Sequence, residues 1–212
     1  MLPTDKSTVK RKPKRAIYNR KEIYKIIDSN SLCHIGFIHE NYPIVIPTTY
    51  GRVGDVLYIH GALVSRLLVK LEKGIPISVS IARETGLALA RTATNHSMNY
   101  ESVVIFGKGT LVADNDKKMA LKSILDNVIK GRWEEVKEPT ENELKGTKVI
   151  AISMDEVTGK RRDEGVGDKK SDRGEKVWAG IVPIIKKYGK PQPDEYLQKD
   201  FPISNSIKNL YK

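Results

Sequence analysis

The chain has 212 residues, of which 39% are hydrophobic and 30% charged, a composition typical of a soluble globular protein with enough apolar material for a core. No segment approaches the ~20 consecutive apolar residues of a membrane helix, and the first residues are polar, so we expect neither membrane insertion nor a secretory leader. The single cysteine, Cys33, excludes an internal disulfide and fits a reducing, cytoplasmic setting.

The net charge of +11 is concentrated near the N-terminus. Residues 6–25 hold nine Lys or Arg against one Glu, a net charge of +8, so the rest of the chain carries only +3. Such a run is most often a solvated, mobile end, although RNA, an anionic membrane or an acidic partner can also bind one. We therefore expect residues 1–16 to form a basic tail that folding does not require, and we expect no specific nucleic-acid binding.

The first half of the chain predicts three strands and two helices. A short amphipathic helix is expected within residues 19–30. Strands are expected at 32–39, 44–50 and 56–60, and their short connections predict an antiparallel meander. A second amphipathic helix is expected from about residue 63 to residue 73, closed by Gly74.

The second half adds further strands around one long helix. Strands are expected at 75–82, 86–90, 102–113, 147–154 and 177–185. The long helix follows Asp114 and should turn Leu121, Leu125 and Val128 inward, and TENE at 140–143 has the spacing of a capping box. Residues 155–176 are predicted to be a surface loop. Six to seven mostly antiparallel strands with a few helices predict an α+β, mainly β, barrel-like domain.

The junction between the third strand and its helix has the residues of a phosphate site. Gly61 and Ala62 permit a close approach to the backbone, and the Ser65 hydroxyl and Arg66 guanidinium follow in the first helical turn. A tight turn with a surface arginine explains the same residues, and on these residues alone it is slightly favoured. The polar segment RTATNHSMNY is similarly either a binding segment or a long connection.

Other catalytic signatures are missing from the sequence. The four histidines are scattered and there is no CxxC pair, so we expect no metal site. No Walker loop, GxGxxG after a strand or GxSxG elbow occurs, so the sequence identifies no catalytic residue.

Four segments together carry a family resemblance: CHIGFIHENYPIVIPTTYGRVGDVLYIHGALVSRLL, LARTATNHSMNYESVVIFGKG, GRWEEVKEPTENELKGT and VWAGIVP. They resemble the FMN-binding split β-barrel family of pyridoxamine 5'-phosphate oxidase-like proteins, in the flavin-nucleotide-binding branch related to nitroimidazole-resistance proteins. The resemblance covers residues 17–185, which we expect to form the domain, with 186–212 as a C-terminal extension.

The resemblance implies an FMN site in two parts. At the strand–helix corner, Ser65 and Arg66 would bind the flavin phosphate, and the neighbouring backbone would line the flavin. The residues implied there are Pro47, Thr48 and Thr49 at the isoalloxazine and His60, Gly61 and Ala62 at the flavin edge. Elsewhere, Ser102 would touch the cofactor, Lys160 and Arg162 would add anion contacts, and Trp178 would cross a dimer interface.

The implied function is a homodimeric, FMN-dependent oxidoreductase acting on a small molecule, with a nicotinamide nucleotide as electron donor. Two residues depart from the family pattern: Glu101 stands where Arg is expected, and no RxH follows Trp178. The alternative is a flavin- or haem-binding module for storage, sensing or regulation. His60 separates the two functions only weakly, because it could be an axial ligand, a substrate contact or a structural residue.

Overall fold

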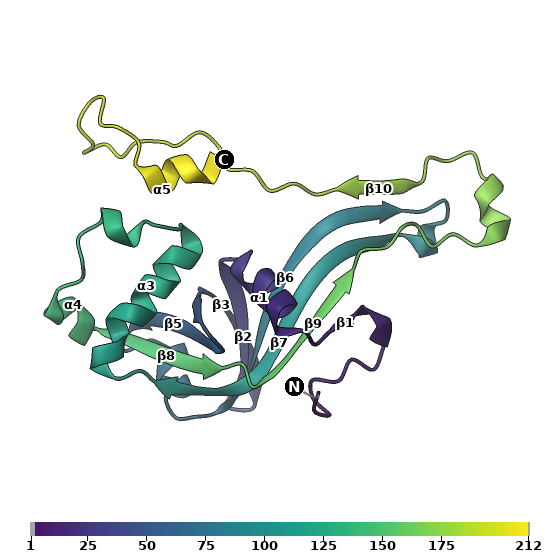
Figure 1. Cartoon of the computed structure of the whole chain (residues 1–212). Helices are drawn as coiled ribbons and strands as arrows, with labels where there is room; N and C mark the ends of the chain where they lie inside the picture. Colours follow the sequence, from purple (N-terminus) through teal and green to yellow (C-terminus); the bar gives the residue numbers. More distant parts are fainter. Residues whose placement is uncertain (1–2, 212) are drawn as a thin grey trace.

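A ten-stranded, mostly antiparallel sheet forms the body of the computed structural model, which describes residues 3–211 (Figure 1). Seven strands follow in the order β3-β2-β6-β7-β8-β5-β4, β1 and β7 both pair with β9, and β10 pairs with β6. The strands are β1 Ala16–Ile17, β2 Leu32–His39, β3 Tyr42–Thr49, β4 Gly51–Val53, β5 Val56–Ala62, β6 Pro76–Leu89, β7 Ser97–Leu111, β8 Thr147–Ser153, β9 Glu156–Arg162 and β10 Gly180–Pro183. This confirms the expected α+β, mainly β class.

Five α-helices accompany the sheet within the described residues. They are α1 Arg20–Asp28, α2 Arg66–Leu71, α3 Lys117–Val128, α4 Glu141–Lys145 and α5 Asn205–Lys208. The predicted capping box is present at α4, where the Thr140 side chain accepts from the Glu143 backbone and Glu143 accepts from the Thr140 backbone. No helix among the described residues is both long enough and apolar enough to cross a membrane.

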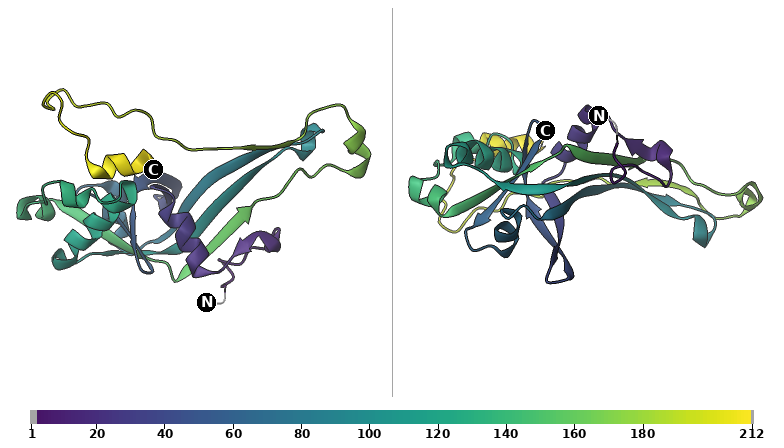
Figure 2. Two further views of the ribbon diagram at one scale, coloured as in Figure 1. Left: turned by 45° about the horizontal axis from the view of Figure 1, so that its top comes forward. Right: turned by 90° about the horizontal axis from the view of Figure 1, so that it is seen from below.

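Strands β6 and β7 extend far beyond the barrel and form an arm (Figures 1 and 2). Their inner halves contribute Val79, Ile81, Val103 and Ile105 to the core, where each is fully buried. Their outer halves leave the barrel, and β10 pairs there with residues 86–89 of β6. One pair of strands therefore forms both a wall of the barrel and the projecting arm.

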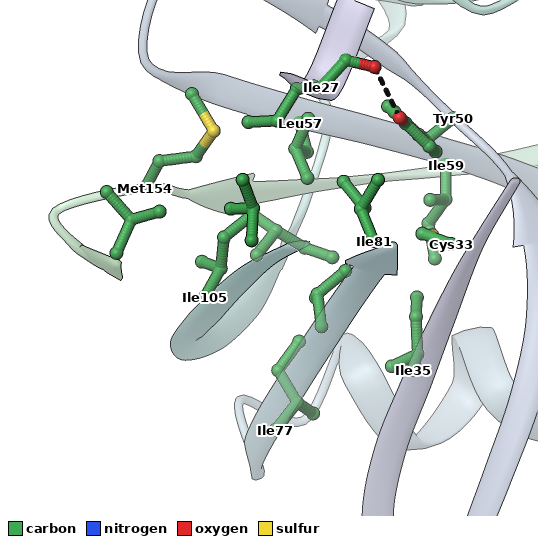
Figure 3. Close-up of a cluster of buried hydrophobic side chains, with 14 of the residues drawn as sticks. Ile27, Cys33, Ile35, Tyr50, Leu57, Ile59, Ile77, Ile81, Ile105 and Met154 are labelled. Atoms are coloured by element: carbon green, nitrogen blue, oxygen red, sulfur yellow. Dashed lines mark hydrogen bonds between the residues drawn. The ribbon is translucent and has the colours of Figure 1, made fainter. Parts of the chain in front are cut away.

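The core lies inside the barrel, between the strands and the inner faces of α1 and α2 (Figure 3). Alternate residues such as Ile35 on β2 and Leu57 and Ile59 on β5 are fully buried, as expected for strands with one face inward. Tyr50 is also fully buried, and its hydroxyl donates to the Ile27 carbonyl at 2.6 Å (Figure 3).

Several predicted strand boundaries are wrong, and the expected count of six to seven is too low. The expected strands 75–82 and 86–90 are one strand, β6, and β7 begins at Ser97 rather than at 102. Strand β9 lies within the predicted surface loop. Strands β1 and β4, of two and three residues, are too short to leave a periodic pattern.

The predicted meander is also wrong in one respect. β2 and β3 form the expected hairpin, but β3 ends one side of the sheet while β5 pairs with β4 and β8 near the other. Short connections alone do not reveal which strands pair, because the chain crosses between the two ends of the sheet at the turn around Tyr50.

Both ends of the described chain contact the body. Lys6 pairs with Glu156 at 3.5 Å, and β1 continues the N-terminal segment into the sheet beside β9. The chain beyond β10 returns along the arm to α5 (Figure 2), where the Ser206 backbone donates to Glu135 at 2.9 Å. The hydrogen bonds from Ser206 lower the pKa of Glu135 to about 2, so this carboxylate stays charged at neutral pH.

The close contact between β4 and α3 depends on Gly51. A Cβ atom there would lie 2.3 Å from the Ser123 carbonyl carbon and 2.4 Å from the Ile124 nitrogen, both of them backbone atoms. We expect Gly51→Ala to lower the free energy of unfolding by ~3 kcal/mol or more, the upper range for overpacking. Urea denaturation measures this, with Gly167→Ala as control because a Cβ at Gly167 meets nothing within 4 Å. Equal stability of the two variants would contradict the close approach.

Candidate functional site

The corner between β5 and α2 leaves two anion-binding groups without partners. The Ser65 backbone donates to the Ala62 carbonyl at 3.0 Å, which forms the turn, and α2 begins at Arg66. Within residues 3–211, neither the Ser65 hydroxyl nor the Arg66 guanidinium has a hydrogen-bond or ion-pair partner. Both are therefore available to a ligand with a phosphate group.

Gly61 is required for the way α2 packs on β5. A Cβ atom at Gly61 would lie 3.1 Å from Leu68 Cδ1, and Leu68 is buried in the core. The small residue therefore lets Leu68 of α2 pack closely on β5, whereas the predicted approach of a ligand to the Gly61 backbone stays a prediction.

A cavity of about 560 Å³ lies between the barrel and α3. Thr49 at the end of β3 and His60 on β5 reach it from strands near opposite ends of the sheet. Its remaining wall is largely apolar and comes from α3 and the chain that follows it: Leu121, Ile124, Leu125, Val128, Trp133, Val136 and Pro139 among others. A volume of this size suits a cofactor or substrate-sized molecule.

The stripe of Leu121, Leu125 and Val128 was predicted to face the core, and that prediction holds only for Leu121, which packs against a small buried cluster around Ala120. The buried residues of α3 are Lys117, Ala120 and Ile124, while the predicted stripe lines the cavity and is only partly covered. An apolar helix face shows the same periodicity whether side chains or a ligand fill the space beside it. Trp133, which the sequence analysis did not single out, lies in the same wall.

His60 is the one imidazole on this cavity wall. Partial burial lowers the pKa of His60, which keeps the ring neutral near pH 7. A neutral imidazole can accept a proton, donate a hydrogen bond or ligate a metal. Pro47 lies on the same face of the edge strand β3 as Thr49, whereas Thr48 is paired with the buried Cys33 and faces the barrel interior.

The other predicted contacts lie on strands that enter or form the arm. Ser102 and Lys160 are paired across β7 and β9, and the Ser102 hydroxyl donates to the Lys160 carbonyl at 3.4 Å. Arg162 is only 5% exposed, and its guanidinium donates to Asn99 and to the carbonyls of Glu164 and Gly165. Its protein partners indicate a structural role for Arg162.

Trp178 precedes β10 and is 65% exposed. Its ring lies over Gly180, where a Cβ atom would meet ring carbons at 3.0 Å. Trp178 therefore does not fill the core of its own barrel. The predicted contacts fall into two groups, one at the β3–β5–α2 corner and one toward the arm, and β10 lies on the arm, away from β5 (Figure 1).

Glu101, which departs from the family pattern, has a defined partner set. Its carboxylate accepts from Arg83 at 2.6 and 2.9 Å and from Arg161 at 2.7 Å, and Arg161 also donates to Glu22. Burial opposes its charge, but the hydrogen bonds from the two arginines outweigh burial and lower the pKa of Glu101. These groups join the arm to the barrel and to α1.

Comparison with known proteins gives consistent results. A family model described as pyridoxamine 5'-phosphate oxidase matches residues 19–161. The structure of the FAD and haem binding protein from Mycobacterium smegmatis has a TM-score of 0.90 and 29% identity, over 93% of this chain and 97% of that one. The flavocytochrome Anf3 from Azotobacter vinelandii has a TM-score of 0.90 and 31% identity, over 98% and 97%.

A more distant structure shows the fold alone. It is a candidate 5-nitroimidazole antibiotic resistance protein from Bacteroides thetaiotaomicron, with a TM-score of 0.57 and 23% identity over 70% of this chain and 90% of that one. Among proteins of curated function, none matches the chain.

Replacing Arg162 and replacing Lys160 should change the stability of the protein by different amounts. We expect Arg162→Gln to lower the free energy of unfolding by ~1.5–3 kcal/mol, the contribution of a hydrogen bond to a charged group, because the buried Asn99 and two backbone carbonyls lose their charged donor. Lys160→Gln should stay within ~0.5 kcal/mol, since its ammonium makes one exposed hydrogen bond, to the Arg11 carbonyl. Urea denaturation of the flavin-free protein measures both, and an unaffected Arg162→Gln would contradict the structural role.

Proposed function

Because the chain belongs to the pyridoxamine 5'-phosphate oxidase family and has its FMN-binding split-barrel fold, we propose that it is a flavin-binding oxidoreductase that works as a homodimer. The observation that carries the proposal is the pair of unpartnered groups at the corner, Ser65 and Arg66. They occur in a chain that matches two flavin-associated proteins over nearly its whole length.

We propose FMN as the flavin, because its single terminal phosphate would meet the one pair of unpartnered groups at the corner. The Ser65 hydroxyl and Arg66 guanidinium would bind its terminal phosphate, while the backbone of residues 60–62 would line the ribityl chain and ring edge. The isoalloxazine would then lie along the outer side of the barrel toward Pro47, Thr48 and Thr49. The apolar part of the ring would then meet the largely apolar cavity wall formed by α3.

The corner cannot supply the whole affinity. A hydrogen bond to a charged group contributes ~1.5–3 kcal/mol, whereas micromolar binding requires about 8 kcal/mol. Contacts to the flavin ring must provide the remainder, and these need a second wall. Trp178 is a large aromatic side chain left 65% exposed on the arm, and the arm projects beyond its own barrel (Figure 2). A second copy of the chain would bring this arm to the corner.

The flavin would supply the electron-transfer chemistry, and the chain would supply binding, orientation and exclusion of water. The neutral His60 ring can hydrogen-bond a bound substrate or exchange a proton with it. The substrate would be a small molecule that enters the cavity, and the electron donor is either a nicotinamide nucleotide or another reductant.

The absorption spectrum of the purified protein tests the proposal. Flavin maxima, followed by mass identification of FMN after heat release, would support it. A colourless protein that binds neither FMN nor FAD on titration would refute it. Reduction of the bound flavin and its reoxidation by a substrate then separate an oxidoreductase from a binding module.

Arg66→Ala should weaken FMN binding ten- to a hundredfold, which corresponds to ~1.5–3 kcal/mol, and leave riboflavin binding nearly unchanged. The reason is that riboflavin lacks the phosphate. Fluorescence quenching measures both ligands, and Lys73→Ala, near the other end of α2, is the matched control. Equal losses for FMN and riboflavin would contradict phosphate binding by Arg66.

A second candidate function, a flavin- and haem-binding redox protein, is favoured by His60. The Mycobacterium smegmatis protein is named for binding FAD and haem, and His60 is a neutral imidazole on a largely apolar cavity. Histidine is a common axial ligand of haem iron. Haemin titration should give a Soret band that His60→Ala shifts or removes, while His34→Ala, on the exposed face of β2, should not. Identical spectra for all three proteins would exclude His60 as the ligand.

A further inference from the structure

The basic N-terminal segment is fixed to the body through its flanking residues and its backbone, which leaves its cations exposed. Ser7 is buried, the Val9 backbone donates to the Tyr18 hydroxyl at 3.1 Å, and the Lys160 ammonium donates to the Arg11 carbonyl at 3.2 Å. Arg15 then donates twice to Glu164, at 2.5 and 2.7 Å. Between these attachments lies the basic strip, residues 10–14.

The four cations of the basic strip have no hydrogen-bonded or ion-paired partner among the described residues, and only Lys12 interacts with a carboxylate at longer range, that of Glu164. The side chains of Lys10, Arg11, Lys12 and Lys14 are exposed, and none makes a hydrogen bond or ion pair with residues 3–211. Fixing several like charges close together is unfavourable, because the charges repel one another and the chain loses conformational entropy. The attachment holds four exposed cations at one place on the surface, an arrangement complementary in charge to an anionic partner.

The basic strip also lies beside the strand that carries predicted cofactor contacts. Ala16, just after the strip, is paired with Lys160 of β9, and Lys160 is paired with Ser102 of β7. Figure 1 shows the N-terminal segment running beside β1 and β9. A partner bound to the strip would therefore sit next to the side of the sheet from which Ser102 and Lys160 are expected to reach the flavin.

We propose that the basic strip is a docking surface for an acidic electron-carrier protein that reduces the bound flavin. This inference rests on the proposed flavin function. Two carriers each lose one electron. The flavin takes up these two electrons together with two protons from the solvent. The strip reads Lys-Arg-Lys-Pro-Lys and has neither apolar side chains to enter a bilayer nor aromatic rings to stack on bases, which favours a protein partner over a membrane or RNA.

The test uses the full chain and a fluorescently labelled plant-type [2Fe–2S] ferredoxin, an acidic one-electron carrier, as probe. The strip variant K10Q/R11Q/K12Q/K14Q is compared with K73Q/K108Q/K130Q/K145Q, which removes the same net charge from exposed lysines elsewhere. Fluorescence anisotropy at low ionic strength should show binding weakened about tenfold or more in the strip variant and less than about twofold in the control. Binding to the parent should weaken as salt is added.

Three results would overturn the proposal. The first is equal weakening in both variants, which would show a net-charge effect. The second is no ferredoxin binding by the parent. The third is strip-dependent binding to phosphatidylserine vesicles or to poly(U) that exceeds ferredoxin binding. Anisotropy does not require bound flavin, so failure of docking is separable from failure of the flavin function, which the absorption spectrum and dithionite bleaching report.

Discussion

The pairing of β6 with β7 is the interaction on which the rest of the structure depends. It runs from Pro76 opposite Lys108 to Ala88 opposite Ser97, with one register shift between Glu84 and Gly86. Its inner half closes the barrel around the core, and its outer half carries β10 and the exposed Trp178. Because backbone hydrogen bonds run through both halves, the barrel and the arm are held in a fixed relation.

Ion pairs, rather than apolar contacts, connect the side chains where the barrel half of the β6–β7 pair meets the arm half. Arg83 and Glu101 are directly paired across the strands, and Arg161 of β9 adds a second guanidinium to the same carboxylate. Arg161 also donates to Glu22, so the same group of charges contacts α1. The Glu101 that departs from the family pattern thus has a structural explanation: it joins three strands at the base of the arm.

The sequence predicted the barrel strands and the β5–α2 corner well, because each leaves a local signal: alternation in the strands, and Gly61, Ser65 and Arg66 in the corner. It missed the continuity of β6, since Arg83 and Glu84 interrupt the apolar pattern and their partners lie far along the chain. It missed β9 because Lys160 and Arg162 give that segment the composition of a polar loop. In the structure β9 is a strand between β1 and β7. The cavity beside α3 was missed for a further reason, since periodicity reports an apolar face but not what fills the space next to it.

The central claim is that each flavin site combines the corner of one subunit with the arm of another. A mixed dimer of Arg66→Ala and Trp178→Ala subunits, purified through two different affinity tags, tests it directly by its flavin content. In a shared site, one of the two sites regains both Arg66 and Trp178, so the mixed dimer should bind one flavin with parental affinity although each variant alone binds weakly. If both residues serve the same subunit's site, no intact site forms, and a mixed dimer with no tight flavin binding would contradict the account.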